Sequence, residues 1–273
     1  MRDPRRQSGV SGTTGLSRGL FLLVLFCPIV GAMTGTTRAD DAVKVFAAGS
    51  LRDAFHAIAA EAGGKIEFTF GPAGVLRERI AHGDAADLFA SANMEHPLAL
   101  AAAGKAGPVT RFTRNAICAI ALPGTGLTPG NLIARMLDPN VKLAIFTPGA
   151  DPAGDYALRV FDRADAVQKG AGATLRAKAK PLLGGREAPK VPAGQSPIAY
   201  RLRAGDADLF LGYCTIGTGP GGKEPETVKL PAAIAVAADY GLTVLHERAA
   251  KLAAFILSEK GQAILARFGF APR

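Results

Sequence analysis

The sequence of 273 residues contains no tryptophan and only four tyrosines. Because sugar rings are usually bound against large aromatic side chains, this scarcity argues against a sugar-stacking site. The basic residues are scattered along the chain and form no stripe interleaved with aromatic residues. Nucleic acid is therefore not an expected partner.

Motifs of the common catalytic and nucleotide-binding sites are also missing. The chain has no Walker motif (GxxxxGKS or GxxxxGKT), and no HExxH, GxSxG or SxxK pattern stands out: the one GxSxG match, residues 15–19, lies before the hydrophobic stretch near the start of the chain. The run GTGPGG at residues 217–222 is followed by a charged loop, so it does not fit a dinucleotide fingerprint. The four histidines, His56, His82, His96 and His246, are widely separated and predict no metal site. Metal-dependent and hydrolytic enzymes have little support, and no cofactor is expected.

A single hydrophobic stretch of 14 residues, 20–33, lies near the start of the chain and contains Pro28. A helix that spans a bilayer needs roughly 20 apolar residues, so this stretch fits an export signal better than an anchor. Arginines precede it, and Thr37-Arg38-Ala39 resembles a cleavage site. We therefore expect residues 1–39 to be a cleaved signal peptide and the mature protein to be periplasmic.

Two minor alternatives for this segment are a twin-arginine signal at Arg5-Arg6 and a lipid-attachment site at Cys27. The mature chain then keeps 27 basic and 22 acidic residues, which is a mild positive excess. It also keeps two cysteines, Cys118 and Cys214. In an exported protein such a pair can form a disulfide, and two buried thiols that never meet are the alternative.

From residue 40 onward, strand-like and helix-like segments alternate, which is typical of an α/β fold with mixed, mostly parallel sheets flanked by helices. The expected strands are residues 43–48, 66–70, 87–91, 116–122, 143–147, 209–213 and 232–237. The expected helices are residues 51–62, 75–81, 96–103, 129–136, 156–164, 198–204 and 249–268.

Two stretches, residues 114–123 and 217–230, look like crossings between two α/β blocks. The second is rich in Gly, Pro and charge, as surface loops are. We therefore expect two lobes, residues 40–115 plus 230–273 and residues 116–229. A single wide sheet is the alternative.

Three glycine-bearing loops join a strand to a helix, at Gly49-Ser50, at residues 71–74 and at residues 152–154. In open α/β sheets, ligands bind beyond the carboxyl ends of the strands, where helix N-termini present unpaired N–H groups. Ser50 stands at such a position, where its hydroxyl can cap the helix or bind a ligand. Taken together, the loops indicate an anion site.

At these loops the sequence resembles the periplasmic molybdate-binding proteins of ABC importers. The resemblance covers the mature chain through five blocks: VKVFAAGSLRDAF, FGPAGVLRERIAHGDAADLFASAN, DPAGDYA, GDADLFLGYC and FILSEKGQAILARFGF. It implies a two-lobed type II periplasmic binding fold with two hinge crossings, which closes on a tetrahedral dianion without a cofactor or metal. It also implies a monomer that delivers molybdate or tungstate to a membrane permease.

The site residues implied by the resemblance match this sequence unequally. Ser50 and Tyr213 match hydroxyl donors, and Ala153 matches a backbone N–H donor. Ala73 stands where the family usually has a serine, so only its N–H is left, and a further backbone amide falls at Gln195 or Ser196. Losing one hydroxyl leaves the identity of the oxyanion open.

Three alternatives remain at this point. Sulfate is smaller than molybdate, and phosphate carries a proton that needs an acceptor, which Asp151 or Asp155 could supply. An α/β enzyme acting on a phosphorylated metabolite would need a base, and the same two aspartates are the candidates.

Overall fold

The computed structural model describes residues 42–188, 191–192, 195–216 and 225–273. The expected signal peptide, including Cys27, lies outside these residues. No helix within them is both long and apolar enough to cross a membrane.

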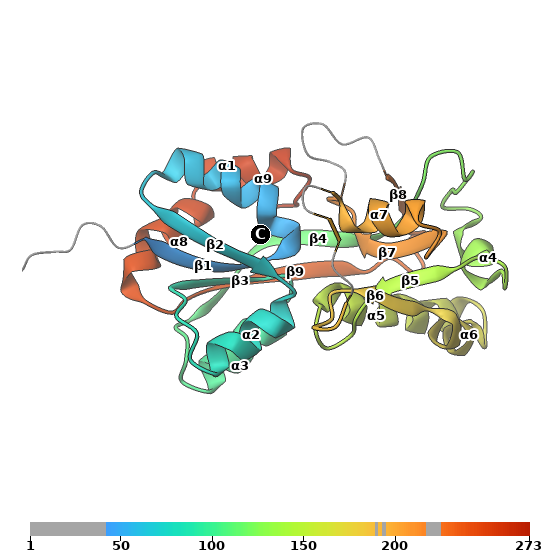
Figure 1. The fold of residues 1–273 in the computed structure, drawn as a ribbon, viewed down its shortest axis with the longest axis horizontal. Helices are drawn as coiled ribbons and strands as arrows, with labels where there is room; N and C mark the ends of the chain where they lie inside the picture. The colour runs from blue at the N-terminus through green and yellow to red at the C-terminus, as the bar shows by residue number, and fades with distance from the viewer. Residues whose placement is uncertain (1–41, 189–190, 193–194, 217–224) are drawn as a thin grey trace, which may run out of the picture. The chain divides into compact units, whose positions relative to one another are not determined.

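Within the described residues, nine strands form one mixed sheet, in the order β2-β1-β3-β9-β4-β7-β5-β6, with β8 paired to β4 (Figure 1). The strands are β1 (Val43–Ala48), β2 (Ile66–Gly71), β3 (Leu88–Ser91), β4 (Val109–Ala121), β5 (Leu143–Phe146), β6 (Lys180–Leu183), β7 (Leu209–Tyr213), β8 (Glu226–Lys229) and β9 (Ala237–Val244). The β1 ladders to β2 and β3, and the β5 ladders to β6 and β7, are parallel. The ladders that join β9, β4, β7 and β8 are antiparallel.

Helices connect the strands. They are α1 (Arg52–Ala62), α2 (Ala73–Ala81), α3 (Glu95–Ala102), α4 (Leu132–Leu137), α5 (Pro152–Val167), α6 (Ala171–Lys178), α7 (Pro197–Arg203), α8 (Ala250–Leu257) and α9 (Glu259–Arg267), with short 3-10 turns η1 (Gly49–Leu51) and η2 (Glu247–Ala249). In α5, buried residues recur at helical spacing at Ala153, Ala157, Val160, Phe161 and Ala164, so one face of the helix packs against the sheet.

The long strand β4 passes from one part of the sheet to the other beside β9, as Figure 1 shows. Its first half pairs with β9, from Val109 to Ala116, and its second half pairs with β7 and β8. The C-terminal segment also holds β4, because Ala271 exchanges two backbone hydrogen bonds with Arg114, of 2.9 and 3.1 Å. The Thr113 hydroxyl donates a third bond to the carbonyl of Ala271, at 2.8 Å. The crossing strand is thus fastened on several sides.

The expected strands at 43–48 and 209–213 have the observed bounds, and most other expected elements differ by a few residues at their ends. The expected strand at 232–237 is wrong: residues 232–234 form a turn, closed by a bond from Ile234 N–H to the Pro231 carbonyl, and β9 begins at Ala237. Only Ile234 and Val236 of this run are buried in the core, while Ala232, Ala233 and Ala237 are exposed, so its apolar composition does not mark an extended strand. Of the second expected crossing, residues 217–224 lie outside the described residues and its end forms β8.

An aromatic series runs through the core toward the ends of the strands. Phe55 contacts Phe112, Phe112 contacts Tyr240, and Tyr240 contacts Tyr213, with ring centroids 6.1, 6.3 and 5.6 Å apart. Phe55, Phe112 and Tyr240 are fully buried. This packing holds Tyr213, which lines the candidate site, and Tyr240, whose hydroxyl lies within hydrogen-bond distance of Ser50.

Candidate functional site

A cavity of about 300 Å³ lies beyond the carboxyl ends of the parallel strands. The last residues of β1, β2, β5, β6 and β7 all line it. The other lining residues follow these strand ends or begin the next helix: Gly49, Ser50, Arg52, Pro72, Ala73, Ala92, Asp151, Gly184, Ser196, Pro197, Ile198 and Ile216. Two of the three glycine-bearing loops line this space, at Gly49-Ser50 and at residues 71–73, whereas residues 152–154 do not.

Four of the six predicted site residues line the cavity: Ser50, Ala73, Ser196 and Tyr213. Ala153 does not, since it is fully buried and its N–H donates to Oδ1 of Asp151 at 3.0 Å. Gln195 is also outside the wall; it is exposed, and its N–H donates to the Pro192 carbonyl at 3.3 Å. Of the two candidates before α7, Ser196 is therefore the one that faces the cavity.

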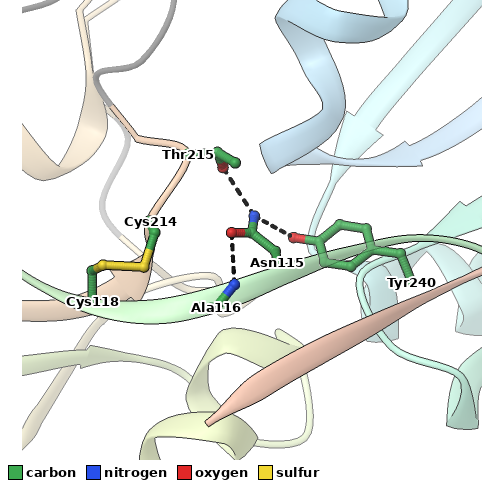
Figure 2. Close-up of a disulfide and its surroundings, with 6 residues drawn as sticks. All are labelled: Asn115, Ala116, Cys118, Cys214, Thr215 and Tyr240. Atoms are coloured by element: carbon green, nitrogen blue, oxygen red, sulfur yellow. Dashed lines mark hydrogen bonds between the residues drawn. A yellow bond between two sulfur atoms is a disulfide. The ribbon is translucent and has the colours of Figure 1, made fainter. Parts of the chain in front are cut away.

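The Ser50 side chain is held by a hydrogen-bond chain that ends at Thr215. Its hydroxyl lies 2.9 Å from the hydroxyl of Tyr240. Nδ2 of Asn115 donates to the Tyr240 oxygen at 3.3 Å and to Thr215 Oγ1 at 3.0 Å, and the N–H of Ala116 donates to Asn115 Oδ1, as Figure 2 shows. Either hydroxyl can be the donor in this bond, and Tyr240 can donate to Ser50 while it accepts from Asn115. The Ser50 hydrogen is then left for the cavity.

Tyr213 supplies a hydroxyl without a partner. Its ring is 4% exposed, and its buried hydroxyl has no hydrogen-bond partner among the described residues. Burial raises the pKa of Tyr213 well above its ordinary value, and the nearby Tyr240 and Asp151 raise it further. The hydroxyl therefore stays protonated and can donate a hydrogen bond. Buried polar atoms usually have a hydrogen-bond partner, so its lack of one is unusual.

Backbone N–H groups add to this donor set. No side chain caps the start of η1 at Ala48 or of α2 at Pro72. Both starts reach the cavity, where their orphan N–H groups and positive dipole ends favour an anion. Arg52 adds one cation to the wall, with its guanidinium 4.5 Å above the Phe70 ring centroid.

Asp151 is the wall residue that the sequence analysis treated as a possible acceptor or, in the enzyme alternative, a possible base. It caps α5 through the bond from Ala153 N–H, and burial raises the pKa of its carboxyl to about 7, with a further increase from Asp155. Asp155 itself does not line this cavity, and its carboxylate accepts the N–H of Gly149 at 2.8 Å. In the sequence, an aspartate before a proline is an ordinary helix N-cap. Nothing in that pattern marks Asp151 as a residue of the cavity wall.

Cys118 and Cys214 form a disulfide, which joins β4 to the residue directly after Tyr213 (Figure 2). The N–H of Cys214 also donates to the Ala116 carbonyl at 2.9 Å. The strand end that carries Tyr213 is thus attached to the crossing strand twice. Within the described ranges, no group of three His, Cys, Asp or Glu side chains is placed to hold a metal ion.

Two known proteins are similar to this chain in sequence. A Pasteurella multocida protein, PM1146, is 35% identical over 179 residues, which cover 63% of this chain and 74% of that protein. The molybdate-binding protein ModA of Mycobacterium tuberculosis is 26% identical over 278 residues, 94% of this chain and 98% of its own length.

Two solved structures share the fold. The periplasmic molybdate-binding protein of Azotobacter vinelandii has a TM-score of 0.67 at 18% identity, covering 85% of this chain and 99% of its own. The sulfate-binding protein SubI of M. tuberculosis has a TM-score of 0.66 at 16% identity, covering 85% and 86%. The model of one family matches residues 43–271, almost all that the structure describes. The chain therefore belongs to the bacterial extracellular solute-binding protein family.

Proposed function

We propose that this protein captures a tetrahedral oxyanion, molybdate or tungstate first, and delivers it to an ABC importer in the membrane. The observation that carries the proposal is Tyr213, a cavity-lining residue whose buried hydroxyl has no hydrogen-bond partner in the described part of the chain, together with Ser50 and two helix starts without a side-chain cap. A fully ionised oxyanion has only acceptor oxygens, so it suits a set of donors. The curated molybdate-binding relative supports this choice of anion.

We infer that the protein works as two lobes, residues 40–115 plus 230–273 and residues 116–229, that close on the anion. Three contacts between these segments support the closure. Gly74 N–H donates to the Ala150 carbonyl at 2.9 Å, Arg159 pairs with Glu95 at 2.9 Å, and Arg186 pairs with Glu78. Closure excludes water, which strengthens each hydrogen bond to the anion. We further propose that it acts as a periplasmic monomer, without cofactor or nucleic acid.

The test is a calorimetric titration of the purified mature protein with molybdate, tungstate, sulfate and phosphate. Ser50→Ala and Tyr213→Phe should each weaken binding of the preferred anion by about 1–3 kcal/mol, because each removes one hydroxyl donor to a charged group. Tyr200→Phe is the matched control, because it removes a phenolic hydroxyl from α7 that does not line the cavity, and it should leave affinity unchanged. Unaltered affinity in both cavity variants would refute the assigned pocket.

Sulfate or phosphate is the second candidate. Ala73 removes one hydroxyl from the expected set, and Asp151 places an acceptor in the wall, which is the partner that the proton of hydrogen phosphate requires. The family offers no support for the enzyme alternative, since its members bind solutes. Tighter binding of phosphate than of molybdate in the titration would favour this candidate.

A further inference from the structure

A carboxyl group stands in the wall of a cavity that is otherwise suited to anions. Asp151 Oδ1 accepts the N–H of Ala153 at 3.0 Å, while Oδ2 has no donor among the described residues. Gly184 lies directly against the side chain: a Cβ atom on Gly184 would come within 2.7 Å of Asp151 Cβ and 3.1 Å of Oδ2. The carboxyl is therefore confined, with one oxygen used and the other left for the cavity.

The titratable groups that face Asp151 come from its own helix and from two strands. They are Asp155 of α5, Tyr213 of β7 and Tyr240 of β9. Burial first of all raises the pKa of each of these tyrosines, so they stay neutral. Arg52 of α1 is the cation among the described lining residues. An ionised Asp151 would thus face an incoming dianion with little compensation.

We propose that Asp151 makes anion capture proton-linked, so that the occupied cavity holds one proton between Asp151 Oδ2 and an anion oxygen. This rests on the proposed oxyanion function. A fully ionised anion such as molybdate or sulfate binds when Oδ2 has taken a proton from solvent, and the O–H then donates to the anion. A hydrogen phosphate brings its own proton and donates it to the ionised carboxylate. In both cases the proton count of the bound state is the same.

The raised pKa of Asp151, about 7, sets the pH range of the effect. Below it the carboxyl is already protonated, and capture of molybdate takes up no proton. Above it each bound molybdate takes up one proton, so affinity falls about tenfold per pH unit. Between pH 7 and pH 9 the dissociation constant should thus rise on the order of 100-fold.

The experiment is calorimetry with sodium molybdate at pH 6, 7, 8 and 9, in two buffers of different ionisation enthalpy at each pH. The difference in heat between the buffers counts the protons taken up. The expected count for the wild-type protein is near zero at pH 6 and near one at pH 9. A count near zero at pH 9, with molybdate bound, would overturn the proposal whether or not any variant folds.

The Asp151→Asn variant provides the second readout. Its amide oxygen can still accept the Ala153 N–H, and its amide nitrogen can donate to the anion as a protonated Asp151 would. We expect molybdate binding without proton uptake and with a flat dependence on pH. Asp162→Asn removes an exposed carboxylate of the same helix that pairs with Arg176, and it should keep the wild-type dependence.

A wild-type pH dependence in Asp151→Asn, or loss of molybdate binding in a variant that still melts cooperatively, would overturn the role of Asp151. If no oxyanion binds the wild-type protein at any pH, the proposed function fails instead. The two failures are therefore distinguishable.

Discussion

Gly184 shows at the scale of one residue how closely the wall of the cavity is built. Its backbone has a φ of +79°, a region that residues with a side chain rarely adopt, and Asp151 fills the space where a Cβ atom would lie. Gly184 thus allows the turn after β6 and also lets the Asp151 carboxyl lie against the backbone.

Replacement of Gly184 by Ala should destabilise the protein by about 1–3 kcal/mol from backbone strain, with an added loss from crowding against Asp151. Gly205→Ala is a matched control, because Gly205 has a φ of +71° and open space at its Cβ position. Chemical denaturation of both variants measures the difference. Equal losses would mean that contact with Asp151 carries no cost.

Single residues of the site could be predicted only where a donor is visible in the sequence. Ser50 and Tyr213 carry hydroxyls at the ends of expected strands, and both line the cavity. Ala153 is different, because the availability of its N–H depends on the side chain of Asp151 two residues earlier. Such competition between a ligand and a local cap is decided by side-chain geometry, which no pattern of residue types reveals.

At the scale of the secondary-structure element, the disulfide connects two strands that are already neighbours. Cys118 lies opposite Gly212 in the β4–β7 ladder, and the bond closes a sequence separation of 96 residues. A covalent link over so long a loop restricts mainly the unfolded chain.

Reduction of this disulfide should lower the free energy of unfolding by roughly 2–5 kcal/mol. Urea denaturation with and without dithiothreitol measures the loss. The double variant Cys118→Ala, Cys214→Ala should be equally unstable and insensitive to dithiothreitol. A reduced wild-type protein as stable as the oxidised one would contradict the expected contribution.

Secondary-structure prediction failed at two segments, where the residue types do not match the backbone conformation. Strand β9 contains Asp239 and Gly241, which weaken a strand signal, yet Gly241 is needed because a Cβ there would lie 2.7 Å from Pro97. Residues 232–236 show the opposite case, an apolar run that forms a turn with only Ile234 and Val236 buried. Only the tertiary neighbours explain either segment.

At the scale of the whole molecule, the alternation of strands and helices predicted the α/β class. The resemblance to periplasmic molybdate-binding proteins predicted the type of binding fold. The antiparallel centre could not be read from composition, since β4 and β9 pair across more than a hundred residues. Pairing at such distance depends on the complete fold.

Ligand binding should stabilise the whole folded chain. At an anion concentration of 100 times Kd the gain is about 2.7 kcal/mol, because only the folded state has the cavity. For a protein of this size, this gain corresponds to a rise in Tm of about 5–10 °C. Thermal denaturation with molybdate, against potassium chloride of equal ionic strength, measures it. The same shift with chloride would indicate a general salt effect rather than binding.

The attachment of Ala271 to β4 has a mechanical consequence. The three hydrogen bonds that the C-terminal segment makes with Thr113 and Arg114 hold the crossing strand directly before residue 116, where the second proposed lobe begins. The stiffness of this joint is thus set partly by residues remote from the anion. Changes near the end of the sequence would alter how readily the cavity opens while every contact in its wall stays the same.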